Sequence, residues 1–265
     1  MGAAVIGNLL RSEYRKTATV KLWWAMGLGP LAVGVLSGSL SLAVFGGSFS
    51  GSGSGSGSGL GSSAVGGAIG LVTALFFLLM FSAIFGAVNS AGEYRHKTIS
   101  TTFLTTRSRG RSVLAKLTVT ALVGVLYAVV IEIVTITLIA IVGKDLPSVD
   151  GQVVGFLAMA VIVTVLWTLM GAGLGTLLAS SVASAVGIVV YYLLGELLLT
   201  ALLNSAGAEE LNRFLPQQAT VAAILGIGSD FSGLLPWWGG LLTLTGWTAL
   251  LCMGGWAVTR VRDVG

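Results

Sequence analysis

The sequence predicts an all-α integral membrane protein with six transmembrane helices, an N-terminal interfacial helix and a short cytoplasmic helix. Apolar residues make up 55% of the 265 residues and charged residues only 9%, whereas soluble domains carry about 25% charged residues. Six apolar stretches reach the roughly 20 residues that a bilayer crossing needs, and only a helix satisfies its backbone within one such stretch. Little remains for a soluble domain, so residues 1–265 form one transmembrane domain.

The N-terminal 21 residues hold four basic side chains with apolar ones interspersed among them, which is typical of an amphipathic helix lying on the membrane surface. The apolar run that follows is longer than the core of a signal peptide and is therefore read as a retained first span, residues 22–46. Trp23 and Trp24 at its start mark the headgroup level.

Residues 47–66 are dominated by Gly and Ser, which predicts a flexible extracytoplasmic loop without chemistry of its own. Ser180 and Ser181 predict a tight turn between two spans, and Pro216–Leu225 predicts a short helix resting on the outer surface. The remaining spans are expected at residues 67–91, 117–142, 153–179, 184–203 and 238–258.

The distribution of basic residues predicts the orientation. Of the 14 Lys and Arg residues, only Lys144 and Arg213 fall in loops on one side. The others fall on the opposite side: Arg11, Arg15, Lys16, Lys21, Arg95, Lys97, Arg107, Arg109, Arg111, Lys116, Arg260 and Arg262. Because Lys and Arg concentrate on the cytoplasmic side, we expect both termini in the cytoplasm and the protein in the cytoplasmic (inner) membrane. This placement accounts for the net charge of +4 without nucleic acid as a partner.

The most polar stretch between two spans is residues 92–116, which also holds the single histidine, His96. One interpretation is a topogenic loop, charged only to stay in the cytoplasm. The other is a docking element. Its acidic start at Glu93 and basic end at Arg107–Arg111 fit a short helix along the membrane surface, because this order complements the helix dipole.

The amino-acid sequence of this stretch is similar to that of a known family. Glu93-Tyr94-Arg95-His96-Lys97-Thr98, followed by Thr101-Thr102-Phe103-Leu104-Thr105-Thr106-Arg107 and by Val113-Leu114-Ala115-Lys116, resembles the first cytoplasmic loop of type-2 ABC-exporter permeases. The motif covers only residues 93–116, whereas the six-span layout extends the resemblance to nearly the whole chain.

The resemblance implies a transport subunit, not an enzyme. It implies an exporter for an amphipathic substrate such as a drug, lipid, peptide or glycan, in which residues 92–116 form a coupling helix that docks into a separate ATPase. The implied partners are two ATP-binding-cassette ATPase subunits, which bind ATP and Mg, a second permease copy or a related permease, and membrane lipid. The implied contacts to the ATPase come from Glu93, Tyr94, Arg95, Thr98 and Phe103.

Motifs for chemistry are absent from the sequence. No Gly-x-x-x-x-Gly-Lys-Ser/Thr loop occurs for nucleotide phosphates, and one histidine does not make a two-histidine zinc motif. We therefore expect no catalytic residue, cofactor or metal in this chain. Gly171-Ala-Gly-Leu-Gly175 resembles part of a dinucleotide loop, but inside a span small residues favour close helix packing.

Two acids lie within predicted spans, Glu132 and Glu196. Such acids usually face a bundle interior or water. At four-residue spacing Glu196 shares a helical face with Tyr192 and Thr200, and Glu132 has Tyr127 and Thr135 near its face. Three roles stay open: a tie between helices, a proton relay in a proton-coupled secondary transporter that runs without an ATPase, and an acid pair in an intramembrane enzyme.

Overall fold

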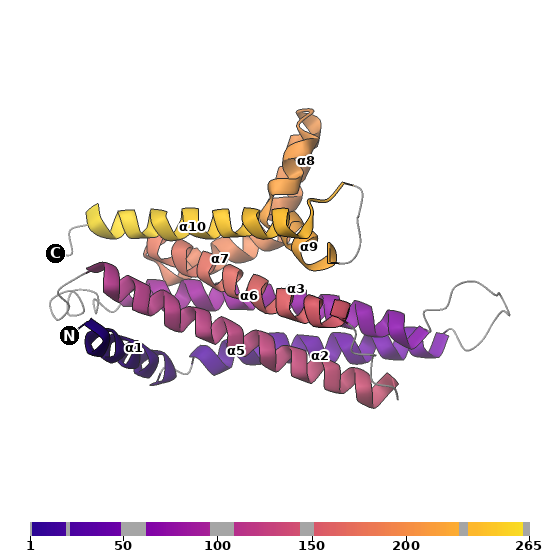
Figure 1. Ribbon diagram of the computed structural model, residues 1–265. Helices are drawn as coiled ribbons and strands as arrows, with labels where there is room; N and C mark the ends of the chain where they lie inside the picture. Colours follow the sequence, from indigo (N-terminus) through magenta and orange to yellow (C-terminus); the bar gives the residue numbers. More distant parts are fainter. Residues whose placement is uncertain are drawn as a thin grey trace.

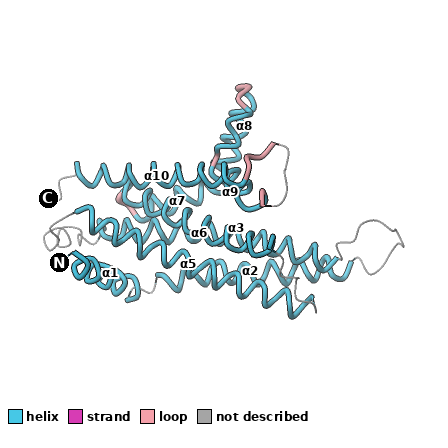
Figure 2. Tube along the Cα trace, viewed as in Figure 1, coloured by secondary structure: helices cyan, strands magenta, loops and turns pink. Residues whose placement is uncertain are grey.

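The computed structural model describes residues 2–19, 22–48, 62–95, 109–143, 151–227 and 233–261. Within these ranges every regular element is a helix, which confirms the all-α prediction (Figures 1 and 2). The long helices lie roughly side by side as a bundle, and one shorter helix, α8, projects away from it.

Each predicted span falls within helical structure, except that α6 ends one residue before the predicted end of the fourth span. Five of the spans lie in single long helices: α2 (Leu22–Ser48), α3 (Ser62–Arg95), α5 (Arg109–Gly143), α6 (Gly151–Leu178) and α10 (Trp237–Val261). The fifth predicted span, 184–203, is composite: α7 (Ser181–Val190), a π-helical turn η1 (Tyr191–Gly195) and α8 (Glu196–Ser205). The connecting elements are α1 (Gly2–Thr19), the 3-10 helix η2 (Glu209–Phe214) and α9 (Pro216–Leu225).

Five stretches of the described chain are long and apolar enough to cross a membrane: Val72–Gly92, Val113–Thr137, Gly151–Leu178, Ser181–Ser205 and Trp237–Thr259. The count rises to six if the bent pair Arg11–Thr19 and Trp23–Leu36, whose axes differ by 62°, is taken as one span. Large apolar side chains remain exposed along these helices, among them Leu122 at 61% and Leu198 at 66%. Long apolar helices with apolar outer faces indicate a multi-pass membrane protein.

Helix α6 packs against α3 on one side and α10 on the other, because small residues let the backbones approach. A Cβ added to Gly171 would collide with the carbonyl oxygen of Ala83, and one added to Gly175 would collide with that of Ala87. On the α10 side, a Cβ on Gly173 would lie 2.7 Å from the backbone nitrogen of Cys252. The prediction that this glycine run serves close helix packing is confirmed.

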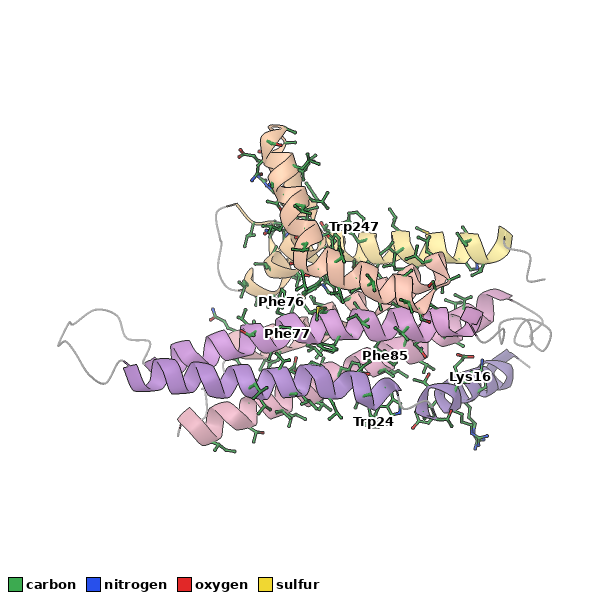
Figure 3. All side chains as sticks on the ribbon, turned by 180° about the vertical axis from the view of Figure 1, so that it is seen from behind. Lys16, Trp24, Phe76, Phe77, Phe85 and Trp247 are labelled. Atoms are coloured by element: carbon green, nitrogen blue, oxygen red, sulfur yellow. The ribbon has the colours of Figure 1, made fainter. Side chains whose placement is uncertain are left out.

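Aromatic side chains fill the space between α3 and its neighbours (Figure 3). The ring of Phe85 meets Tyr127 of α5 edge to face at 5.5 Å between centroids. The buried ring of Tyr192 lies between Phe76, at 4.7 Å, and Trp167 of α6, at 5.1 Å. Such edge-to-face pairs contribute roughly 0.5–1.5 kcal/mol each beyond the area they bury. The pair with Tyr127 joins α3 to α5, and the two pairs of Tyr192 fix the fifth span against α3 and α6.

The two termini lie at the same end of the bundle (Figure 1). The end of α3 at Arg95 and the beginning of α5 at Arg109 also lie there. Helix α1 packs on α5 at this end, with Glu13 and Thr17 buried and Arg11, Tyr14 and Arg15 exposed. The charge pattern predicts that these helix ends lie on one side of the membrane, and in the structure they lie at one end of the bundle.

Candidate functional site

The predicted coupling residues lie at the edge of what the structure describes. Glu93, Tyr94 and Arg95 continue α3 as its last turn, so their backbone is helical. Thr98 and Phe103 lie outside the described residues, as does most of the predicted short helix. Of the residues expected to start and end this helix, Glu93, Arg109 and Arg111 do not belong to it, and Arg107 lies outside the described residues. Glu93 belongs to the end of α3, whereas Arg109 and Arg111 begin α5, so the dipole argument does not apply to these residues.

Glu132 lies on α5 and is not part of the cluster around Glu196 that is described below. Its Oε1 is buried and has no hydrogen-bond partner in the described part of the chain. Tyr127, expected near its face, turns instead toward α2, where its hydroxyl donates to the carbonyl oxygen of Trp23. The structure therefore does not join Tyr127 and Glu132 into one site.

Glu196 is the centre of a polar cluster inside the bundle, and only 5% of the residue is exposed. Its Oε2 accepts hydrogen bonds from the backbone N–H of Gln217 at 2.8 Å and from the hydroxyl of Tyr191 at 3.1 Å. Its Oε1 accepts one from the backbone N–H of Gln218 at 2.9 Å. Both carboxylate oxygens are therefore occupied, and the carboxylate sits at the N-terminus of α9.

The local sequence explains why α9 needs this acid. Leu215 precedes α9 and cannot cap it, and Pro216 occupies the first turn, where its missing N–H costs nothing. The next two N–H groups, of Gln217 and Gln218, have no partner within a helix. A carboxylate supplies acceptors for them, and the positive end of the helix dipole favours its charge.

A second contact ties α9 to the same turn. The Gln217 side chain donates from Nε2 to the carbonyl oxygen of Tyr192 at 2.7 Å. Deeper in the bundle the indole of Trp167 donates to the hydroxyl of Thr220 at 2.9 Å, which attaches α9 to α6. Ala219 and Ala223 of α9 lie against Gly240 of α10, where a Cβ would meet their backbone at 2.5 and 2.8 Å. Helix α9 is thus inserted among α6, η1 and α10, and does not simply rest on an outer surface.

The predicted partners of Glu196 are only partly correct. In a regular α-helix residues four apart share a face, and this predicts Tyr192 and Thr200. The π-turn adds one residue to the turn, so the hydroxyl that reaches Glu196 is that of Tyr191, five residues earlier. Tyr192 contributes its carbonyl oxygen to the cluster and its ring to the core. Thr200 is half-buried farther along α8.

Sequence reasoning missed the residues of η1, α9 and α6 that complete the cluster. These are Tyr191, Gln217, Gln218, Trp167 and Thr220. The available signal was weak: two adjacent glutamines after a proline, at the start of an otherwise apolar helix.

Two apolar cavities flank this cluster. The first, of about 340 Å³, is lined on one wall by Tyr191, Leu215 and Pro216 and on others by residues of α6 and α10. The second, of about 130 Å³, is lined by Tyr192, Gln217 and Thr220 together with residues of α3. Trp247 of α10 lines the first cavity and donates from its indole to the carbonyl oxygen of Phe214 at 2.9 Å, near the base of α8 (Figure 3).

Among the described residues, no group of three or more His, Cys, Asp or Glu side chains is arranged to hold a metal ion. No protein-family model matches the chain, and a search of curated proteins finds no match.

Proposed function

We propose that the chain is the membrane permease subunit of an ATP-binding-cassette exporter. It moves an amphipathic substrate across the cytoplasmic membrane, powered by two separate ATPase subunits and paired with a second permease. The Glu-Tyr-Arg-His-Lys-Thr motif at residues 93–98 supports this proposal, together with the layout of long apolar helices. The substrate class follows from the resemblance, and the apolar cavities are compatible with it.

One structural observation carries the proposal furthest. Helices α3 and α5, of 34 and 35 residues, both end or begin at the end of the bundle that holds the two termini. At about 1.5 Å per residue each is about 50 Å long, whereas the hydrocarbon core is about 30 Å thick. At these ends the helices carry charged residues, Glu93 and Arg95 in α3 and Arg109 and Arg111 in α5, next to the apolar stretches. Residues 93–112 thus connect two rigid helices outside the apolar stretch, where force from a partner reaches the bundle.

The alternative is a proton-coupled secondary transporter, and one observation favours it. Glu132 holds a buried oxygen without a partner in the described chain, as expected of a group that exchanges protons. Glu196 favours it less, because both of its oxygens are engaged by α9 and Tyr191. In this alternative Glu132→Gln abolishes transport and no ATPase is required.

The proposal predicts that Tyr94 and Glu93 contact the ATPase. An aromatic anchor and a charge that fixes register suit a protein groove, whereas an anionic lipid surface attracts basic residues by about 1 kcal/mol each and repels an acid. We expect Tyr94→Ala and Glu93→Ala to weaken ATPase association or uncouple hydrolysis from transport, with membrane insertion unchanged. The measurement is co-purification of the ATPase and substrate-stimulated hydrolysis in reconstituted vesicles.

The matched control is lysine replacement of Arg107, Arg109 and Arg111, one at a time, which keeps the charge and should preserve both readouts. The contrary outcome is that Tyr94→Ala and Glu93→Ala bind the ATPase and transport normally, while replacing all three arginines with Ala abolishes function. Residues 92–116 would then be an anchor to the lipid surface. The coupling proposal is then wrong.

A further inference from the structure

The contact between η1 and α9 divides two cavities. Tyr191 and Pro216 face the larger one, and Tyr192 and Gln217 face the smaller one. Glu196 lies where these four residues meet, since it bonds to Tyr191 and to the backbone of Gln217. At this point the partition is held by the hydrogen bonds to the Glu196 carboxylate and by the bond from Gln217 Nε2 to the Tyr192 carbonyl oxygen. Farther along α9, Trp167 of the larger cavity bonds to Thr220 of the smaller one.

The π-turn determines which way this carboxylate points. In a regular α-helix each residue advances about 100°, so residues five apart lie about 140° apart around the axis. The hydrogen bond from Tyr191 to Glu196 spans five residues and therefore requires the wider π-turn. If Tyr191–Gly195 were regular α-helix, Glu196 would stack on Tyr192 and turn away from Gln217 and Gln218.

The dependence is mutual. Helix α9 loses its only described N-terminal cap if Glu196 turns away. Conversely, the π-turn is fastened by α9, because Gln217 Nε2 bonds to the Tyr192 carbonyl oxygen inside that turn. Single π-turns are rare and concentrate at functional sites. A rare turn and a helix that stabilise each other have two consistent arrangements, closed with both in place and open with both released.

We propose that η1 and α9 form a latch, that Glu196 is its catch, and that opening the latch joins the two apolar cavities into one passage. In the closed arrangement α9 separates the cavities. In the open arrangement η1 becomes regular α-helix, Glu196 leaves the α9 terminus and the wall made by Pro216 and Gln217 is free to move. Trp167 and Thr220 hold the far part of α9 to α6, so the motion is confined to its first turn. This inference does not depend on coupling to an ATPase.

The test is hydrogen exchange of the full-length protein in lipid nanodiscs. We expect Glu196→Ala to speed exchange of the amides of residues 217–220 at least tenfold and to leave α3 and α6 unchanged. Glu196→Gln should give a smaller increase, because an amide offers one acceptor oxygen where the carboxylate offers two. Glu210→Gln is the matched control, since Glu210 lies in the same region and its side chain is exposed. Unchanged exchange in Glu196→Ala would overturn the latch.

A second variant tests the role of the π-turn. Deleting Leu194, which is exposed, removes the extra residue and leaves Glu196 facing α9 on a regular α-helix. We expect this variant to protect residues 217–220 as well as the unchanged chain does, or better. Loss of that protection, with α3 and α6 still protected, would show that the π-turn does not set the direction of Glu196.

The joining of the two cavities is tested separately, by the reactivity of cysteines placed in them. In a chain with Cys252→Ala, a cysteine is placed at Ile188, which is buried and lines the larger cavity, or at Ile224, which lines the smaller one. Adding Glu196→Ala should speed the reaction of both thiols with N-ethylmaleimide several-fold. If α9 loses protection but neither thiol reacts faster, Glu196 only caps a helix and the gating part of the proposal is wrong.

Discussion

Gly171 and Gly175 show how single hydrogen atoms position a helix in this bundle. Their Cα atoms face the carbonyl oxygens of Ala83 and Ala87 so closely that no side chain fits. These contacts bring α6 onto α3, and α6 in turn carries Trp167, which holds α9. The attachment of the candidate site therefore depends on glycines one to two turns away from it.

We predict that Gly171→Ala lowers stability by about 1–3 kcal/mol, because the new methyl group must push two backbones apart. Gly246→Ala in α10 is the control, since a Cβ there meets nothing within 4 Å. It should raise stability by up to about 1 kcal/mol, because alanine favours helix more than glycine does. Thermal unfolding in detergent measures both. Equal effects of the two substitutions would contradict the close contact.

The residue scale also shows what the sequence could not predict. Spacing along a regular helix predicted that Glu196 shares a face with Tyr192 and Thr200. The π-turn contains one residue more than an α-helical turn, so the hydroxyl that donates to Glu196 is that of Tyr191. A π-turn has no sequence signature here, because η1 is the plain apolar stretch Tyr-Tyr-Leu-Leu-Gly.

At the scale of elements, α9 was predictable and its position was not. Pro216 at the start and the apolar run that follows predicted a helix at residues 216–225, and this is confirmed. Its insertion against α6, η1 and α10 depends on partners that lie about 20 to 50 residues earlier, namely Glu196 and Trp167. Local pattern carries no information about such distant pairs.

We predict that Thr220→Val lowers stability by about 1–3 kcal/mol, although the two side chains have nearly the same shape. The indole N–H of Trp167 is buried and would lose its acceptor. Thr220→Ser retains the hydroxyl and should cost less than half as much. The comparison uses thermal unfolding, together with exchange of the α9 amides. If valine and serine behave alike, the hydrogen bond is not what attaches α9 to α6.

For the whole molecule, composition alone predicted a helical membrane protein, since apolar stretches of span length leave few other structures possible. The predicted boundaries of the later spans differ from the helices by a few residues, except for α5, which starts eight residues earlier than its predicted span, at Arg109. The sixth span stays a prediction, because the five candidate spans do not include α2 by itself. A change of direction between α1 and α2 is expected of a surface helix that leads into a span, but its angle could not be predicted from the sequence, which has no proline or glycine at that point.

Orientation is the property of the whole molecule that charge predicts and helix geometry makes testable. The basic residues of α1, of residues 92–116 and of the C-terminal end belong to elements whose ends lie together in the bundle. Glu209 of η2 is exposed and belongs to the connection between the fifth and sixth spans, on the side with few basic residues. If the end with the basic residues is cytoplasmic, residues 54 and 209 face outward and residue 108 faces inward.

We therefore predict that single cysteines at Ser54 or Glu209, in a chain with Cys252→Ala, react with a membrane-impermeant thiol reagent added to sealed right-side-out cells. A cysteine at Ser108 should react only after the membrane is permeabilised, which also serves as the control that this thiol is reactive. The expected difference for Ser108 before and after permeabilisation is at least tenfold, because a charged reagent does not cross the bilayer on the timescale of labelling. Labelling at Ser108 in sealed cells, with no labelling at Glu209, would reverse the orientation and place residues 92–116 where no ATPase could reach them.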